Sequence, residues 1–253
     1  VIVGARGFSG NQASEGHALV FLANGSGSLE PAPWFTIELS QASAAVGSSV
    51  SAAGDVNGDG YGDVLVGAEL FNGAVSDEGT VRLYLGGSTS LRPQSNWPGQ
   101  LNLAGANLGR SVAGVGDVNR DGFSDFVVGA PGAGRALLYL GSSAGPSRTA
   151  SDVVDGTLSR GLFGQSVAGV GDVNGDGFGD MVIGAPQEGI GALMWEGNVR
   201  LYAGSQQVMF GAPTATRSSG SATAFLGYSV ARAGDVNGDG FADVIAGAFS
   251  AGV

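Results

Sequence analysis

The chain has 253 residues, of which 43% are hydrophobic, only 13% are charged and 48 are glycine. Its formal net charge of −11, with no lysine and no basic run, argues against nucleic acid and anionic membranes as partners. The absence of cysteine excludes disulfides and thiolate chemistry. No apolar run approaches the length that spans a bilayer, so we expect no membrane insertion. The glycine content, which lacks a collagen-like period, predicts many tight turns.

The N-terminal region contains three strand patterns. An apolar run at Val1–Ala5 is followed by an alternating run at His17–Leu22 and by a more divergent run at Trp34–Ser40, which we interpret as an outer strand. Short β-rich runs bounded by Gly, Asn, Asp and Ser are typical of strands. Because no segment of the chain shows a convincing helical period, the sequence predicts strands throughout.

From residue 47 onward, one pattern repeats four times. The segments that align without a gap are 47–68, 109–130, 164–185 and 227–248. In the first of them, a short strand at Ser49–Ala53 leads into an acidic loop, and an apolar strand at Val64–Ala68 leaves it. An alternating strand at Thr80–Leu85 follows, and we expect an outer strand at Gln100–Ala104. This order of signals predicts one supersecondary unit that is copied along the chain.

The repeat predicts an all-β fold, a β-propeller built from four-stranded antiparallel blades, because about four strands in roughly 60 residues make one blade. We treat 1–253 as a single propeller region with incomplete units at both ends. The units are 1–46 (partial), 47–108, 109–163, 164–226 and 227–253 (partial). Unpaired inner strands at both ends would favour aggregation, so we expect the chain to be part of a larger ring, with self-association of a second copy as the other way to complete it.

The acidic loop reads D-V-N-G/R-D-G-F/Y-x-D and presents oxygen atoms at alternate positions. The side-chain oxygens at positions 1, 3, 5 and 9 belong to Asp55, Asn57, Asp59 and Asp63; Asp117, Asn119, Asp121 and Asp125; Asp172, Asn174, Asp176 and Asp180; and Asp235, Asn237, Asp239 and Asp243. Position 7 can offer only its backbone carbonyl, and we expect its ring to pack inward; it is occupied by Tyr61, Phe123, Phe178 and Phe241. This alternation predicts that each loop surrounds one cation.

Calcium is the predicted ion, one in each of the four loops. It takes six to eight oxygen ligands and accepts irregular geometry, whereas magnesium tolerates such geometry poorly. Three carboxylates in one short loop repel each other unless a cation or protons intervene. The same Asn-Gly and Asp-Gly pairs also mark simple hairpin turns, but four loops that each carry all four oxygen side chains favour a metal site. An EF-hand is excluded because position 12 is apolar in every loop, at Val66, Val128, Ile183 and Ala246.

The motifs around the loop resemble a known repeat. An F-G-like pair precedes the loop, as at Phe163–Gly164, and two exit strands end in Gly-Ala-Pro, at Gly129–Pro131 and Gly184–Pro186. The chain is similar over essentially its whole length to the FG-GAP repeat, which builds the seven-bladed propeller head of integrin alpha subunits. The repeat also occurs in bacterial surface proteins, a fungal lectin and accessory domains of a phospholipase. The resemblance implies that the loop joins the first two strands of a blade and that the oxygens named above bind calcium.

The chain departs from the family pattern at four positions. Arg6, Glu69 and Phe249 stand where the pattern has proline, so proline is not essential to this turn. Arg120 replaces glycine at position 4 of the second loop, which removes no ligand.

An enzyme is not predicted. The sequence GSSAG at Gly141–Gly145 has the form of a nucleophile elbow, but no helix follows it. The only histidine, His17, lies in an alternating strand pattern and would have to serve as the base. Saturated oxygen ligation of calcium would also leave no open position for a nucleophile. We therefore expect neither catalytic residues nor an organic cofactor.

The predicted function is a calcium-stabilised binding or adhesion module with a protein or glycan ligand. The alternatives are a lectin-type propeller and an accessory, non-catalytic domain of a secreted hydrolase. Trp34, Trp97 and Trp195 could stack on a sugar or pack between blades, and the sequence leaves both open. From the resemblance we expect a bacterial-type member located outside the cell or on its surface.

Overall fold

The computed structural model describes residues 1–94, 97, 99–158, 160–189, 193–207 and 211–250 of the 253-residue chain. Over these residues the chain forms strands β1 to β17 and no helix. All strand pairs are antiparallel, and the strands of each sheet follow one another in chain order. The predicted all-β fold is confirmed.

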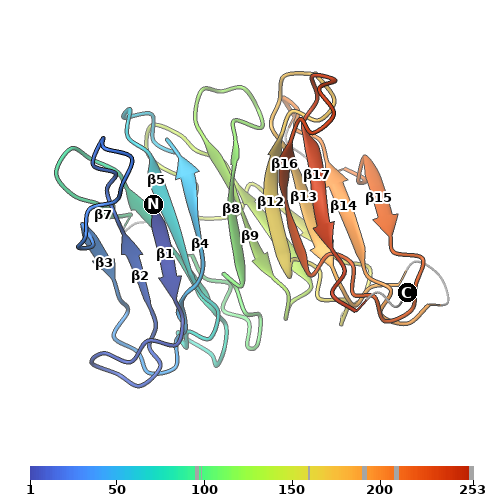
Figure 1. Cartoon of the computed structure of the whole chain (residues 1–253). Coiled ribbons are helices and arrows are strands. Elements are labelled where there is room, and N and C mark those ends of the chain that lie inside the picture. The colour runs from blue at the N-terminus through green and yellow to red at the C-terminus, as the bar shows by residue number, and fades with distance from the viewer. Residues whose placement is uncertain (95–96, 98, 159, 190–192, 208–210, 251–253) are drawn as a thin grey trace.

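The described residues form five sheets, and the first strands of successive sheets pack against one another; Figure 1 colours the sheets from blue to red along the chain. The first contains β1 (Ile2–Ala5), β2 (His17–Val20) and β3 (Phe35–Ile37). The second contains β4 (Val46–Gly54), β5 (Asp63–Ala68), β6 (Thr80–Leu85) and β7 (Arg92–Pro93). The third contains β8 (Ser111–Gly116), β9 (Asp125–Ala130), β10 (Arg135–Tyr139) and β11 (Asp152–Asp155). The fourth contains β12 (Ser166–Gly171), β13 (Asp180–Ala185), β14 (Asn198–Tyr202) and β15 (Ala215–Ser218), and the last contains β16 (Ser229–Gly234) and β17 (Asp243–Gly247). These sheets are blades of a β-propeller.

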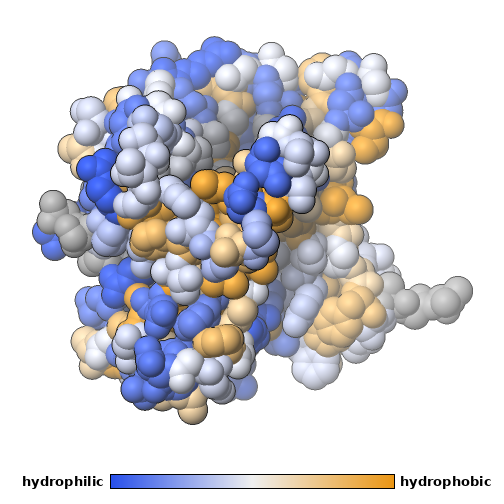
Figure 2. All heavy atoms as spheres, turned by 60° about the vertical axis from the view of Figure 1, so that its left-hand side comes forward, coloured by the Kyte–Doolittle hydropathy of each residue, from blue (hydrophilic) through white to orange (hydrophobic). Residues whose placement is uncertain are grey.

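The second strand of a blade is buried where another blade covers each of its faces. Every residue of β9 and β13 is buried, which explains why these strands read as continuous apolar runs and not as alternating ones. In the last sheet, Ile245 is 59% exposed, whereas Leu65 and Val182 at the same position of other blades are 0% and 1% exposed. Val3 of the first sheet is likewise exposed, and Figure 2, which brings that side forward, shows apolar surface among polar atoms.

Side chains from two successive blades form one hydrophobic core. Leu65 and Leu83 of the second sheet pack in the same cluster as Phe126 and Tyr139 of the third. Trp97 is 3% exposed and lies edge-on to both aromatic rings, with centroids 5.3 Å and 5.0 Å away. Of the two roles left open by the sequence, Trp97 therefore takes the packing role.

The two halves of the repeat motif meet across the interface between blades. A Cβ added to Gly129, in the exit strand β9, would lie 2.0 Å from the carbonyl oxygen of Gly164, the F-G glycine of the next blade. The same 2.0 Å spacing separates Gly67 from the Gly109 carbonyl oxygen. The Oγ of Ser111 also donates to the Gly164 carbonyl, at 2.9 Å. Glycine is thus required here because one backbone packs directly on another.

The outer strand of the second blade differs from the prediction. It is β7, and residues 100–104, where we expected it, form no strand. Pro93 and Arg92 pair with Tyr84 and Leu85 of β6, so the edge contains a residue without an N–H group. Proline is tolerated at a sheet edge, because its nitrogen can face solvent, where no strand requires an N–H donor. The expectation for 34–40 holds over a shorter range, at β3.

Candidate metal-binding loops

The four acidic loops each join the first two strands of a blade, as the family resemblance implied. They lie between β4 and β5, β8 and β9, β12 and β13, and β16 and β17. Because successive blades pack in the same orientation, the loops share one end of the structure (Figure 1). The residue before each loop is a glycine with positive φ, such as Gly54 at 81°, and the strand register shifts there. This bulge turns the chain out of the sheet and into the loop.

Positions 1, 3 and 5 form the tip of each loop. In the first loop, Asp55 Oδ1 accepts hydrogen bonds from the backbone N–H groups of Gly58 (2.7 Å) and Asp59 (3.1 Å). Its Oδ2 accepts from the N–H of Gly60 at 2.8 Å. The side-chain amide of Asn57 donates to Asp59 Oδ2 at 2.9 Å. The Asn-to-Asp bond recurs in all four loops, at 2.8–2.9 Å, so the tips share one conformation.

Position 9 forms the base of each loop. The two carboxylate oxygens of Asp125 accept from the backbone N–H groups of Val118 (2.8 Å) and Gly141 (2.9 Å). Asp63 and Asp180 make the equivalent pairs of bonds, and the three aspartates are at most 1% exposed. Position 9 therefore ties the acidic loop to the chain that leaves the third strand of the same blade.

The pKa of the carboxyl groups is shifted in opposite directions at the tip and at the base of the loops. At the tip, the hydrogen bond from the Asn57 amide and then that from the Tyr61 N–H lower the pKa of Asp59. At the base, burial raises the pKa of Asp63 and Asp180 and raises the pKa of Asp125 to about 7, against the opposing effect of the backbone donors. Burial thus penalises the negative charge of Asp63, Asp125 and Asp180, and a nearby cation would offset that penalty.

The donor set fits a hard cation. Each loop offers carboxylate, amide and carbonyl oxygens and no nitrogen or sulfur ligand, which is the chemistry that calcium takes. Over the described residues, however, the three carboxylates of one loop do not all lie within 4.8 Å of one another. Positions 1, 3 and 5 are hydrogen-bonded within the tip, and position 9 is hydrogen-bonded to the start of the loop and to the chain after the third strand.

The rings at position 7 do not pack inward, contrary to the expectation from the sequence. Tyr61 and Phe241 are 45% and 44% exposed. The rings of the second, third and fourth loops instead lie against the preceding loop. A Cβ added to Gly58, at position 4 of the first loop, would lie 2.7 Å from the Phe123 ring of the second loop. A Cβ at Gly175 would meet the ring of Phe241 at 2.8 Å.

Arg120 stands at position 4 of the second loop, where the first and third loops have glycine, and it contacts the next loop through its guanidinium group. Its guanidinium carbon lies 4.4 Å from the centroid of the Phe178 ring of the third loop. Its Nε donates to the Gly177 carbonyl at 2.8 Å. The cation–π contact takes the place of the ring-on-glycine contact, so neighbouring loops remain coupled.

Glu69, which replaces a motif proline, links three units. Arg6 of the first unit and Arg110 of the third each reach its carboxylate at 2.9 Å. Glu69 is 5% exposed, so this turn is held by ion pairs and not by a rigid ring.

The nucleophile position of the GSSAG sequence, Ser143, lies in an exposed turn between β10 and β11, and no helix follows it among the described residues. The preceding Ser142 closes this turn, because its Oγ donates to the Gly145 carbonyl at 2.6 Å. The chain's only histidine, His17, lies in β2 of the first sheet. The described residues around Ser143 thus form a turn and not a nucleophile elbow.

Sequence reasoning missed two residues that lie close to His17. Glu15 precedes β2 and Glu38 follows β3, and their carboxylates lie 3.7 Å and 3.8 Å from His17 Nε2. The sequence showed only a single histidine in an alternating strand pattern, and that pattern does not predict that Glu15 and Glu38 lie beside it.

The blade order, the loops and the glycine contacts between blades define a repeat protein of the β-propeller class. The family described as FG-GAP repeat matches residues 46–84, 108–146, 163–203 and 226–252, more than half of the chain. The chain belongs to the FG-GAP repeat family.

The relatives include integrin alpha subunits and a phospholipase D. Integrin alpha-IIb of Mus musculus is 38% identical over 146 residues, which is 52% of this chain and 14% of that protein. Integrin alpha-4 of Xenopus laevis is 35% identical over 147 residues, 55% of this chain and 14% of that protein. Phosphatidylinositol-glycan-specific phospholipase D of Rattus norvegicus is 36% identical over 161 residues, 57% of this chain and 19% of that protein. The chain thus matches less than a fifth of the length of these relatives. Across the described residues no helix is both long and apolar enough to cross a bilayer.

Proposed function

We propose that the chain is a calcium-stabilised part of a propeller that serves as an extracellular binding or adhesion module. The observation that carries the proposal is the four-fold recurrence of one oxygen-rich loop at one end of the blades, each with a tip carboxylate held by backbone N–H groups. Calcium would be held by positions 1, 3, 5 and 9 and by the backbone carbonyl of position 7. Its role is structural, because the ion neutralises the loop and fixes the hairpin between the first two strands.

Charge and burial support the proposal. The net charge is −11, and twelve acidic residues are concentrated in the four loops. A buried carboxylate such as Asp125 is costly to ionise, and binding a cation in the folded state converts that cost into stabilisation. Metal binding would therefore be coupled to folding.

The experiment is a calcium titration by isothermal titration calorimetry, together with thermal unfolding with and without EDTA. We expect four calcium ions per chain and a melting temperature that falls by many degrees under chelation. Asp59→Ala should reduce the stoichiometry by one, since Asp59 lies at an exposed loop tip and its loss should not unfold the blade. Glu30→Ala, an exposed acid outside the loops, should leave four ions bound. An unchanged melting temperature in EDTA would contradict the proposal.

A protein ligand is the class that we favour, because the integrin relatives match the repeat over more than half of this chain. The ligand would be held by loops around the ring and not by the ions themselves. Trp195 is 46% exposed and leaves room for a glycan. Glycan-array binding with and without EDTA distinguishes a glycan ligand from a protein ligand, since an array on which no glycan binds favours a protein partner.

The phospholipase D relative favours a second candidate, an accessory and non-catalytic domain of a secreted hydrolase. The chain would then contribute binding or stability while another domain performs the reaction. Hydrolysis assays of the isolated chain should show no activity under either proposal.

A further inference from the structure

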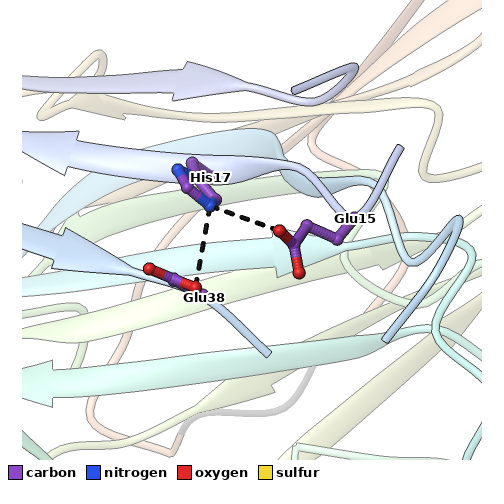
Figure 3. A group of neighbouring side chains, drawn as sticks. All are labelled: Glu15, His17 and Glu38. Atoms are coloured by element: carbon purple, nitrogen blue, oxygen red, sulfur yellow. Dashed lines mark ion pairs between the residues drawn. The ribbon is translucent and has the colours of Figure 1, made fainter. Parts of the chain in front are cut away.

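One cluster of metal-ligating side chains lies outside the acidic loops. Glu15, His17 and Glu38 come from the loop before β2, from β2 itself and from the residue after β3, and Figure 3 shows the three side chains converging. One ligand atom of each lies within 4.8 Å of the others, and no other such group of three occurs in the part of the chain that the structure describes. Convergence of these atoms from separate segments makes the cluster a property of the folded sheet.

The cluster contains buried polar atoms that lack hydrogen bonds. Glu15 is 0% exposed, and within the described structure neither its Oε2 nor His17 Nε2 has a hydrogen-bond partner. A buried polar group without a partner has lost its hydration without gaining a hydrogen bond, and the cost is larger when the group is charged. Glu15 Oε1 accepts one bond, from the Gly10 N–H at 3.1 Å. His17 Nε2 thus faces both carboxylates without a hydrogen bond, whereas the Glu15 oxygen nearest to it, Oε1, has the one bond from Gly10.

The spacing of these atoms fits a shared ion better than direct contact. His17 Nε2 lies 3.7 Å from Glu15 Oε1 and 3.8 Å from Glu38 Oε2, beyond the range of a hydrogen bond. Two ligands that are each about 2.0–2.2 Å from one tetrahedral zinc ion are separated by about 3.3–3.6 Å. Movements of a few tenths of an ångström would bring each of the two carboxylate oxygens to this distance from His17 Nε2.

A glycine keeps the centre of the cluster open. A Cβ added to Gly10 would lie 2.7 Å from Glu15 Oε1 and 3.4 Å from His17 Nε2, so any side chain there would enter the space between the two ligands. The φ of Gly10 is not in the left-handed region, and backbone strain is therefore not the reason for glycine. The Phe8 ring stacks on His17, with centroids 4.0 Å apart, and fixes the imidazole from one side.

Comparison with the next blade shows which residue distinguishes the cluster. Glu78 occupies the position of Glu15, is also 0% exposed, and accepts from the Ala74 N–H at 2.9 Å. The buried glutamate therefore holds a loop in both blades. At the position of His17, however, the next blade has Thr80, whose hydroxyl donates to the Gly99 carbonyl at 3.1 Å. Only the first blade combines the glutamate with an imidazole.

We propose that Glu15, His17 and Glu38 form a binding site for one divalent transition-metal ion of the zinc class, separate from the acidic loops. One imidazole and two carboxylates form a donor set typical of zinc, and imidazole is not a ligand that calcium prefers. Two carboxylates would neutralise the charge of the ion. Glu38 is partly exposed, with 35% of its side chain accessible, so the ion can enter from solvent and complete its coordination with water. By tying β2 to the end of β3, the ion would fasten the outer strand of the first blade.

The single histidine makes a direct test possible. In protein labelled with ¹⁵N-histidine and kept in excess calcium, the imidazole nitrogens of His17 report on this site alone. We expect Zn²⁺ to shift the imidazole signals until one equivalent has been added, and we expect added calcium to leave them unchanged. Signals that do not respond to Zn²⁺ would overturn the proposal and leave His17 as an imidazole placed between two carboxylates, without a metal.

Variants separate this site from zinc bound at the acidic loops. By calorimetry in excess calcium, His17→Thr, which installs the residue of the next blade, should bind one zinc ion fewer than the parent chain. Glu15→Gln and Gly10→Ala should each weaken zinc binding more than about tenfold, because one removes a ligand and the other fills its space. Glu78→Gln is the matched control and should bind zinc as the parent does. Equal zinc binding by His17→Thr and the parent would refute the site, while the calcium stoichiometry would still test the acidic loops.

Discussion

The contact between blades can be tested with Gly129→Ala. The added Cβ would lie 2.0 Å from the Gly164 carbonyl oxygen and 2.2 Å from Ser111 Oγ, whereas a Cβ is essentially never closer than 3.0 Å to another heavy atom. The blades would have to separate by about 1 Å, since the obstructing oxygen belongs to a backbone. Overpacking of this kind costs about 1–3 kcal/mol, and loss of the Ser111 hydrogen bond adds about 1 kcal/mol. The lower chain entropy of alanine returns about 0.5–1 kcal/mol, which leaves a net loss of about 1–3.5 kcal/mol.

Gly247→Ala is the matched control for this prediction. Gly247 occupies the same position in β17, but its added Cβ would meet only Ser229 atoms at 3.8 Å, an ordinary contact. We therefore expect this variant to be neutral or slightly more stable. Both variants are compared by urea denaturation in excess calcium, monitored by tryptophan fluorescence, which includes Trp97, buried between the second and third blades. If the two variants unfold at the same urea concentration, the interpretation of the motif glycines as contact points between blades is wrong.

Two further predictions concern buried ion pairs. Arg200→Met should lower the free energy of unfolding by about 3–5 kcal/mol, because it leaves the fully buried Glu188 without its cation. Arg82→Met, at the same strand position of the second blade, is the control and should cost much less. Thermal unfolding of the two variants checks this prediction. Glu69→Gln should cost about 1–2 kcal/mol, because the carboxylate that accepts from Arg110 is lost while its shape is kept. A Glu69→Gln chain with the melting temperature of the parent would show that these ion pairs contribute nothing to stability.

Local patterns in the sequence predicted the strands and loops well, because each depends on neighbouring residues. The glycine before Asp55 and the Asn-Asp pairing at the tip are short-range features that repeat with the chain. The exclusion of an EF-hand also follows locally, since Val66 at position 12 continues an apolar strand, and it lies in β5. The outer strand was misplaced because β7 is a two-residue edge whose pairing has little sequence signal.

Contacts between segments that are distant in sequence were not predictable in the same way. The ring of Phe123 faces the preceding loop and not the core, which depends on how two blades are stacked. Trp97 had two open roles until its neighbours Phe126 and Tyr139 were placed.

The sequence by itself determined the repeat, the all-β class and the residues that could surround a cation, because period, alternation and spacing are properties of a linear chain. Only the tertiary structure decided which residues meet between blades and that Glu15 and Glu38 converge on His17. Those contacts arise from strand pairing and from the stacking of sheets, which join segments whose separation along the chain follows no pattern.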